Sequence, residues 1–260
     1  MSDNWLGRIV SLEPSVTAII SALGRADLLV GVSTWCDRLV DVGDRARLGT
    51  TWCANADEIK ALEPDLVIAS VPYRAVSVSE LLKAGLDVLC LYPQQLSDVF
   101  AHIITLGRLT EAQQEAEALV ASMRSSLKAI RDQTRSLAHP RVYVEIWNDP
   151  LMSASPWVAE LVHAAGGQFV PPSPGRHVSA QEVLTADPQI IIIAWAGIAD
   201  PSPDEVARRP GWDRLTAIRE GKVFVIDEMM VNVPGPNLVR GAQLLLSCLH
   251  PELVTHSPAS

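Results

Sequence analysis

The sequence lacks several features that would assign it to a common functional class. The 260-residue chain has a net charge of −9, and its Lys and Arg residues are scattered rather than clustered. Because nucleic-acid-binding proteins neutralise phosphates with clustered basic side chains, this distribution argues against a nucleic-acid partner. No apolar run approaches the ~20 residues that a transmembrane helix needs. The four cysteines form no Cys-x-x-Cys pair, so no disulfide framework is predicted.

Catalytic signatures are also missing. The sequence contains no GxSxG, HExxH, GxGxxG or GxxxxGK[ST] motif, and no pair of carboxylates with an adjacent base stands out. The six histidines show no metal-ligand spacing. Cys36, Cys53 and Cys90 fall near predicted strand ends and could meet at a soft metal or ligate a metal centre within a ligand, but ordinary packing is the simpler interpretation. We therefore predict no enzyme, no intrinsic cofactor and no metal site.

The first residues, MSDNWLGRIVSLEPS, do not show the basic-then-apolar pattern of a secretory signal. Two localisations follow from this observation. The protein is expected to be cytoplasmic if Met1 is the native start. It is expected to be periplasmic or otherwise extracytoplasmic if a signal has been removed.

What the sequence does contain is an internal repeat. Residues 61–70 read ALEPDLVIAS and residues 185–195 read TADPQIIIIAW. The segments RIVSLEPS and RVYVEIWNDP precede the two copies, and LLKAGLDVLCLYP and LTAIREGKVFVID follow them in the same order. Matched segments in register predict two lobes of one design. Two similar lobes usually hold a ligand in the cleft between them.

Short apolar runs alternate with helical patterns in both halves of the chain. Continuous apolar runs of this length are typical of strands buried on both faces of a parallel sheet, so we predict an α/β fold with mainly parallel sheets. The predicted strands are residues 8–12, 28–32, 66–69 and 88–91 in the first lobe, and residues 142–146, 190–194 and 223–226 in the second lobe.

A long helix is predicted between the lobes. The segment from Thr110 to Leu137 contains no Gly and no Pro, its apolar residues recur at helical spacing, and Thr110 with Gln113 resembles a capping box. The predicted organisation is therefore an N-terminal α/β lobe (1–109), a bridging helix (110–138) and a C-terminal α/β lobe (139–260). A single stiff helix as the connection predicts small lobe motions.

These segments together resemble a known family. RIVSLEPSVTAIISALG, GVSTWCD, LEPDLVIAS, the long helix and RRPGWDRLTAIREGKVFVIDE are similar, from residue 8 to residue 250, to the helical-backbone (class III) ABC-transporter substrate-binding proteins. That family binds cobalamin, ferric siderophores or haem, and the chain is most similar to its cobalamin-binding branch. The resemblance implies two α/β lobes bridged by one long helix.

Aromatic residues follow most of the predicted strands. The carboxyl ends of parallel strands form one edge of a sheet, where ligands commonly bind, so these residues indicate a flat and largely apolar ligand. The alternative is that they cover the edge of the core. The candidate ligand-binding residues are Trp35, Trp52, Tyr73 and Tyr92 in the first lobe, and Trp147, Trp195 and Met229 in the second lobe.

The resemblance adds further candidates. It places Trp35, Trp52 and Trp147 at or beside loops that line the family's cleft, and Glu13 and Ser15 in the first loop of that cleft. Asn232 lies in the segment MMVNVPGPN, where it could bond to a ligand amide, although a simple Pro-Gly turn explains the segment equally well. Ser70 and Cys90 stand near positions where cobalamin binders tend to have aromatic residues.

The charge at the strand ends bears on the choice of ligand. Iron chelates generally carry negative charge and are often bound by clustered Arg or Lys. The strand-end loops offer Arg38, Arg74 and Arg176, and none of these clusters with another in sequence. A neutral ligand with an amide rim, such as cobalamin or a related corrinoid, is therefore favoured.

Two kinds of function remain open. The first is capture of a corrinoid for an ABC importer, and the resemblance then implies that one acidic residue on each lobe docks on the permease. Asp204 and Glu205 lie near that position in the second lobe, and Glu80 is the nearest acid in the first. The second is storage, sensing or chaperoning of a corrinoid or other tetrapyrrole in the cytosol. Siderophore or haem binding and, more distantly, a metal-cluster enzyme are further alternatives.

Overall fold

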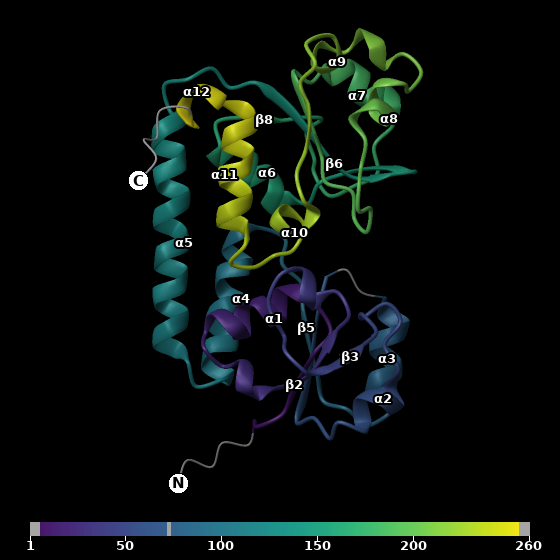
Figure 1. Ribbon diagram of the computed structural model, residues 1–260, viewed down its shortest axis with the longest axis vertical. Helices are drawn as coiled ribbons and strands as arrows, with labels where there is room; N and C mark the ends of the chain where they lie inside the picture. The colour runs from purple at the N-terminus through teal and green to yellow at the C-terminus, as the bar shows by residue number, and fades with distance from the viewer. Residues whose placement is uncertain (1–5, 72–73, 255–260) are drawn as a thin grey trace. The chain divides into compact units, whose positions relative to one another are not determined.

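The computed structural model describes residues 6–71 and 74–254, with the side chain of residue 254 excepted. It divides into two compact units, each built around a mainly parallel β-sheet with helices packed against it (Figure 1). Unit 1 comprises Met1–Ser122 with Pro234–Pro236, and unit 2 comprises Met123–Val233 with Asn237–Ser260. The predicted α/β fold with two similar lobes is confirmed.

Unit 1 contains a fully parallel sheet in the order β3-β2-β1-β4-β5. Its central strands are buried because they carry apolar residues on both faces. The strands are β1 (Ile9–Ser11), β2 (Leu29–Ser33), β3 (Ala46–Leu48), β4 (Leu66–Ser70) and β5 (Val88–Leu91), and the α-helices are α1 (Pro14–Ala22), α2 (Ala56–Lys60), α3 (Ala75–Lys83) and α4 (Leu96–Leu109). The 3-10 turns η1 (Ala26–Leu28) and η2 (Cys36–Arg38) flank β2.

Unit 2 contains a mixed sheet. Its order is β10-β9-β6-β7, with β8 also paired to β6, and only β7 runs antiparallel. The strands are β6 (Arg141–Asn148), β7 (Leu151–Ser153), β8 (Gln168–Phe169), β9 (Ile190–Ile193) and β10 (Val223–Val225). The helices are α6 (Pro156–Ala164), α7 (Ala180–Ala186), α8 (Pro203–Ala207), η3 (Trp212–Arg214), α9 (Thr216–Arg219), α10 (Glu228–Val231), α11 (Leu238–Leu249) and α12 (Pro251–Val254).

The repeat seen in the sequence is also a repeat of side-chain contacts. An arginine at the start of the central strand of each sheet donates hydrogen bonds to backbone carbonyls that precede the next repeated strand. It is Arg8, directly before β1, in unit 1 and Arg141, the first residue of β6, in unit 2. Arg8 binds the carbonyls of Leu62 and Glu63 at 2.6 to 3.1 Å. Arg141 binds those of Ala186 and Asp187 at 2.6 to 3.1 Å. Each arginine thus ties its central strand to the same turn.

Backbone conformation and register repeat as well. Glu63 and Asp187, the acids before the two prolines, both have positive φ, at 47° and 41°. Directly after these turns, Ile9 of β1 pairs with Leu66 of β4, and Val142 of β6 pairs with Ile190 of β9. The acid-proline signature therefore sets a tight turn that feeds a buried parallel strand in each unit.

The predicted long helix begins later than the sequence pattern indicated. Thr110 does not cap it: its hydroxyl donates 2.8 Å to the carbonyl oxygen of Leu106, and the residue ends α4. Glu111 then takes a positive φ of 54°, which breaks the run, and α5 extends from Gln113 to Thr134. Absence of Gly and Pro did not guarantee one continuous helix, because an ordinary residue adopted the left-handed conformation that ends α4.

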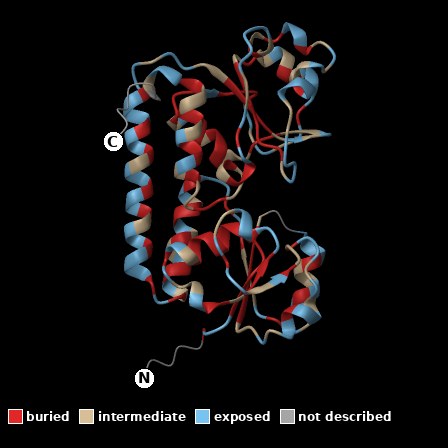
Figure 2. Ribbon diagram, in the orientation of Figure 1, coloured by how far each residue is buried: buried red, intermediate tan, exposed pale blue. Residues whose placement is uncertain are grey.

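Helix α5 nevertheless carries the predicted apolar stripe and contributes to both units, whose division falls between Ser122 and Met123. Its buried residues recur every three or four positions, and most of its other residues are exposed (Figure 2). Helix α4 approaches α5 closely because Gly107 has no side chain: a Cβ there would lie 2.4 Å from that of Ala116. Among the described residues, no helix combines the length and apolarity required of a membrane span.

Candidate functional site

The carboxyl edge of the unit 1 sheet carries exposed aromatic side chains. Trp35 follows β2, Trp52 follows β3 and Tyr92 follows β5. Their side chains are 36%, 50% and 60% exposed, respectively. Since burying a Trp or Tyr side chain from water is favourable, three exposed aromatic rings at one sheet edge form a surface suited to a flat apolar partner.

Each of the two tryptophans has an arginine guanidinium over its ring. The guanidinium carbon of Arg38 lies 5.4 Å from the Trp35 ring centroid, and that of Arg74 lies 5.9 Å from the Trp52 ring centroid. Ser77 on α3 donates a 3.2 Å hydrogen bond to the backbone oxygen of Trp52 and so ties its loop to the helix. The carboxyl edge of the unit 1 sheet therefore carries more positive charge than was expected from arginines that are scattered along the sequence.

A buried polar network lies at the end of β1 and β2. Thr17 on α1 donates to the hydroxyl of Ser11 at 2.7 Å, and its hydroxyl lies 3.1 Å from the Sγ of Cys36. The Ser33 hydroxyl lies 3.3 Å from the same sulfur. Burial raises the pKa of the Cys36 thiol. Cys36 is thus an inert, buried part of the packing at this edge.

Glu13 and Ser15, both predicted ligand residues, are buried at the start of α1. Burial raises the pKa of Glu13 to about 8, although the neighbouring Thr51 opposes the shift. The Thr51 backbone N–H donates a 3.3 Å hydrogen bond to the Glu13 Oε1. The hydroxyl of Ser15 has no protein partner. This corner of unit 1 therefore offers a neutral carboxyl group and an unsatisfied hydroxyl.

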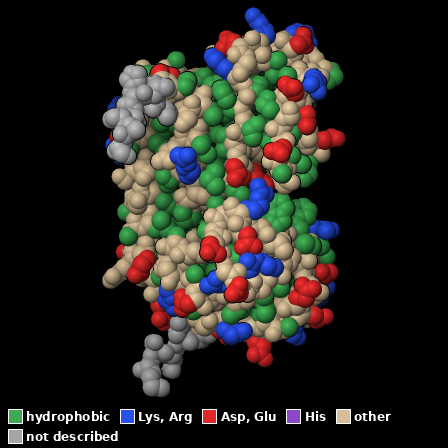
Figure 3. All heavy atoms as spheres, viewed as in Figure 1, with side chains coloured by type: hydrophobic (Ala, Val, Ile, Leu, Met, Phe, Trp, Pro, Cys, Tyr) green, Lys and Arg blue, Asp and Glu red, His purple; other side chains and the backbone are tan. Residues whose placement is uncertain are grey.

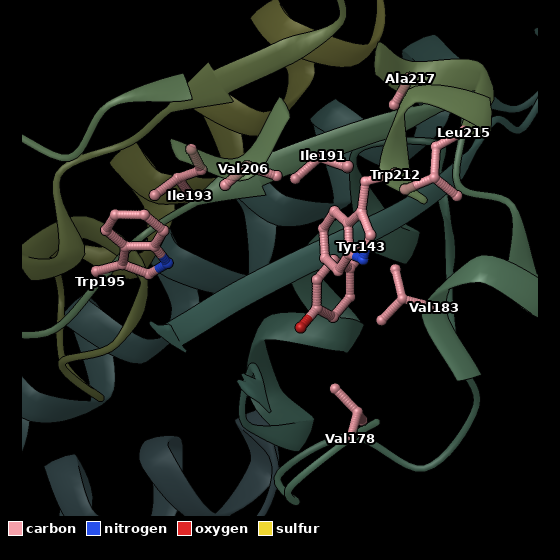
Figure 4. Packing of buried hydrophobic residues seen from close by; sticks show 10 residues of the cluster. All are labelled: Tyr143, Val178, Val183, Ile191, Ile193, Trp195, Val206, Trp212, Leu215 and Ala217. Atoms are coloured by element: carbon pink, nitrogen blue, oxygen red, sulfur yellow. The ribbon is translucent and has the colours of Figure 1, made fainter. Parts of the chain in front are cut away.

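In unit 2, the predicted aromatic residues separate into two kinds. Trp147 near the end of β6 is 44% exposed, and its indole N–H donates 3.0 Å to the backbone oxygen of Asp149. Trp195, only 2% exposed, belongs to the core cluster shown in Figure 4. Trp147 thus presents a face to solvent, whereas Trp195 packs against its own unit.

An ion pair that sequence reasoning missed lies against the core cluster, between buried Glu145 and partly buried Arg209. Glu145 accepts two hydrogen bonds from Arg209, at 2.7 and 2.8 Å, and a third of 2.8 Å from the indole N–H of Trp195. The Arg209 guanidinium lies over the rings of Trp212 and Trp195, 4.6 and 5.8 Å from their centroids. Tyr143 packs edge to face on Trp212 in the same cluster (Figure 4). The acid interrupting the apolar run VYVEIW was the available sequence signal.

The segment after β10 is held by polar contacts within unit 2. Asn232 donates through its amide nitrogen to the carbonyl of Ala194 at 2.7 Å, while its amide oxygen has no partner. Glu228 accepts a 2.7 Å hydrogen bond from the backbone N–H of Gly197. Met229, another predicted ligand residue, is buried in the core. The amide oxygens of Asn232 and of Asn237, in the same segment, are buried without a partner and remain able to accept a hydrogen bond.

Comparisons with known proteins agree with this architecture. The periplasmic binding protein family matches residues 9–229. An ABC-transporter substrate-binding lipoprotein of Bacillus subtilis is 28% identical over 94% of this chain and 80% of its own length. A cobalamin-binding protein of Halobacterium salinarum is 26% identical over 95% of this chain and 70% of its own length. A periplasmic heme-binding protein from Pseudomonas aeruginosa has the same fold, with a TM-score of 0.84, 24% identity and coverage of 98% and 95%.

The chain belongs to the periplasmic binding protein family. The predicted resemblance to class III substrate-binding proteins is confirmed. As a member of this family, the protein binds a solute and is not an enzyme, as the missing catalytic motifs had indicated.

The remaining predicted positions of this periplasmic binding protein lie as follows. Asp204 and Glu205 are exposed in the first turn of α8, where Asp204 pairs with Arg208 at 3.3 Å, and Glu80 is exposed on α3. Tyr73 lies outside the described residues. Within the described part of the chain, Cys36, Cys53 and Cys90 belong to no group of three or more potential metal ligands. Acidic and basic side chains are intermingled on the face shown in Figure 3.

Proposed function

We propose that this periplasmic binding protein captures a corrinoid, such as cobalamin, and delivers it to an ABC importer. The observation that carries the proposal is the set of exposed aromatic side chains at the strand ends: Trp35, Trp52, Tyr92 and Trp147. A corrin ring is flat and largely apolar, so exposed aromatic rings in either unit suit it as contacts. Relatives that include a cobalamin-binding protein support the same ligand class.

Each unit also offers a buried polar group that suits an amide-bearing ligand. Glu13, neutral below its raised pKa, can donate a hydrogen bond to an amide oxygen, and Asn232 retains an unpaired amide oxygen that can accept one from an amide nitrogen. The rim of cobalamin consists of such amides. A buried group left without a partner costs free energy, so a ligand that satisfies these groups gains affinity.

Titration calorimetry with cobalamin, cobinamide, haem and a ferric hydroxamate tests the ligand class. We expect one cobalamin or cobinamide per chain, with quenching of tryptophan fluorescence. Trp52→Ala and Trp147→Ala should each weaken binding by about 1 to 3 kcal/mol if these rings are anchors. Leu82→Ala is the matched control, because Leu82 is exposed on α3 without following a strand. Failure of both corrinoids to bind would overturn the proposal.

Delivery to an importer is tested separately. Asp204, Glu205 and Glu80 are the proposed contacts with the permease, and all three side chains are exposed. Charge reversal, as in Glu205→Lys, should slow corrinoid import by a reconstituted transporter while leaving calorimetric affinity unchanged. Import at the wild-type rate in Glu205→Lys and Glu80→Lys alike would remove these residues from the proposed docking surface.

An anionic tetrapyrrole such as haem is the second candidate. It is favoured by Arg38 and Arg74, which the fold places on the exposed rings of Trp35 and Trp52, where they could pair with carboxylates. Arg176, the third arginine considered from the sequence, belongs to unit 2 and is paired with Glu182 at 2.6 Å. If haem is the ligand, Arg38→Gln and Arg74→Gln should weaken its binding. If a neutral corrinoid is the ligand, the same changes should have little effect on affinity.

A further inference from the structure

A surface depression of about 290 Å³ lies in unit 2, away from the aromatic residues. It is lined by Arg131, Asp132, Thr134, Arg135, His139 and His163. These residues come from the last turn of α5, the segment that precedes β6, and the end of α6 before β8. The depression therefore borders the amino edge of the unit 2 sheet, whereas Trp147 lies toward the carboxyl end of β6.

The charges around this depression are unbalanced. The only carboxylate in its lining, Asp132, is in an ion pair with Lys128. The hydrogen bond from Lys128 lowers the pKa of Asp132, and the nearby charges of Arg131 and Arg135 act in the same direction. Within the part of the chain that the structure describes, the guanidinium groups of Arg131 and Arg135 donate no hydrogen bond to a protein acceptor. Although the chain has a net charge of −9, two arginines without a hydrogen-bonded protein acceptor line this one depression.

The geometry of α5 explains part of this arrangement. Basic residues near a helix C-terminus interact favourably with the helix dipole, which accounts for Arg131 and Arg135 as stabilising residues. The dipole does not explain why His139 and His163, from two other segments, line the same depression. Four basic side chains that converge on a hollow suit a bound anion, and the guanidinium fork matches the oxygen atoms of a phosphate.

We propose that this depression binds a phosphate group, supplied either as free inorganic phosphate or as the headgroup phosphate of an anionic phospholipid. Arg131 and Arg135 would pair with the phosphate oxygens, and His139 and His163 would donate hydrogen bonds from the other wall. The Thr134 hydroxyl is turned inward to backbone carbonyls and takes no part.

Titration of the purified protein with inorganic phosphate, at an ionic strength held constant with chloride, tests the site. Arg135→Gln and His163→Gln should each weaken phosphate binding about tenfold, as expected for loss of one charge-assisted hydrogen bond. Arg124→Gln is the matched control, because Arg124 is exposed on the same helix but does not line the depression. Thermal melting curves check that all three variants fold.

Flotation with vesicles distinguishes the two sources of phosphate. Association with phosphatidylglycerol vesicles but not with phosphatidylcholine vesicles, reduced by Arg135→Gln, would identify a lipid headgroup. Phosphate binding without vesicle association would identify a free solute. Neither phosphate binding nor vesicle association, or equal losses in Arg124→Gln and Arg135→Gln, would overturn the proposal, since the second result would reflect only the general charge of the helix.

Discussion

The two units share one set of arginine hydrogen bonds at the amino edge of their sheets, and they differ at the carboxyl edge. Arg8 and Arg141 hold equivalent turns through equivalent hydrogen bonds. Each unit also buries a glutamate toward the carboxyl end of its central strand. In unit 2, Glu145 forms an ion pair with Arg209. In unit 1, Glu13 accepts a 3.3 Å hydrogen bond from the backbone of Thr51, and its pKa is raised. The repeated part of the design is structural, and the part that has diverged lies where we propose that the ligand binds.

The difference shows how a buried acid can serve two purposes. In unit 2, the acid is satisfied by three donors and organises a core of aromatic rings. In unit 1, the acid keeps its proton at neutral pH and keeps hydrogen-bonding capacity for another molecule. A buried polar group whose hydrogen bonds are all made helps to fix its surroundings, whereas one with spare hydrogen-bonding capacity gains free energy when a partner satisfies it.

Breaking the Glu145–Arg209 pair is expected to have the largest effect. Arg209→Ala leaves a charged carboxylate buried and removes the cation from two tryptophan rings, so unit 2 should lose about 3 to 5 kcal/mol of its free energy of unfolding. Chemical denaturation followed by tryptophan fluorescence measures this loss. Arg208→Ala, which removes only an exposed pair with Asp204, serves as control and should cost less than about 0.5 kcal/mol. Similar costs for the two variants would contradict the assignment.

Glu13, the buried acid of unit 1, should make the stability of the protein depend on pH. Between about pH 4.5 and pH 8, folded Glu13 holds a proton that the unfolded chain releases, so stability should fall as pH rises through this interval. Glu13→Gln cannot ionise, so it should lose this decrease in stability, which is on the order of 5 kcal/mol for a shift from 4.5 to about 8. Denaturation curves at several pH values give the slope directly. A slope that is unchanged in Glu13→Gln would mean that another group titrates.

Ligand binding should sharpen the same contrast. If a corrinoid amide accepts a hydrogen bond from protonated Glu13, affinity should fall as pH rises through the raised pKa of about 8. In Glu13→Gln, whose amide remains a donor at every pH, affinity should be nearly independent of pH over that range. Calorimetric titrations with cobinamide at matched ionic strength provide the comparison. A fall in affinity of equal size in both proteins would show that Glu13 is not the titrating contact.

The shared arginines should give the smallest effects. Arg8→Gln and Arg141→Gln each remove hydrogen bonds to a turn, and each should cost about 1 kcal/mol in stability. Arg141→Gln should lose somewhat more stability than Arg8→Gln, because Arg141 is less exposed and also pairs with Asp187 at 3.1 Å. Calorimetric melting of both variants tests this order. No loss in either variant would show that the repeated contacts are consequences of the fold rather than supports for it.

Much of the fold could be predicted because its signals are local. The strand at residues 88–91 is found at the predicted bounds. The short strands β3, β7 and β8 and the helix α4 were missed. Strands of two or three residues have too little periodicity to recognise, and their pairing partners lie far along the chain. The predicted start of α5 was wrong because Glu111 adopts a positive φ, which no feature of the local sequence indicates.

The candidate ligand-binding residues could likewise be predicted only in part. Strand-end aromatic residues were visible in the sequence, but exposure of Trp147 and burial of Trp195 could not be told apart, since both follow apolar strands. Met229 was likewise proposed as a ligand residue although it is packed in the core. Arg209 did not stand out, because its importance depends on a partner 64 residues away.

The sequence by itself determined the α/β class, the two-fold repeat and the family, because alternating apolar strands, acid-proline turns and helix patterns depend on neighbouring residues. Tertiary structure decided which aromatic rings face solvent and which acid is paired. It also decided that two arginines and two histidines surround one depression in unit 2. These outcomes depend on residues far apart in the chain that meet only when each unit folds, so burial and charge pairing could not be read from local patterns.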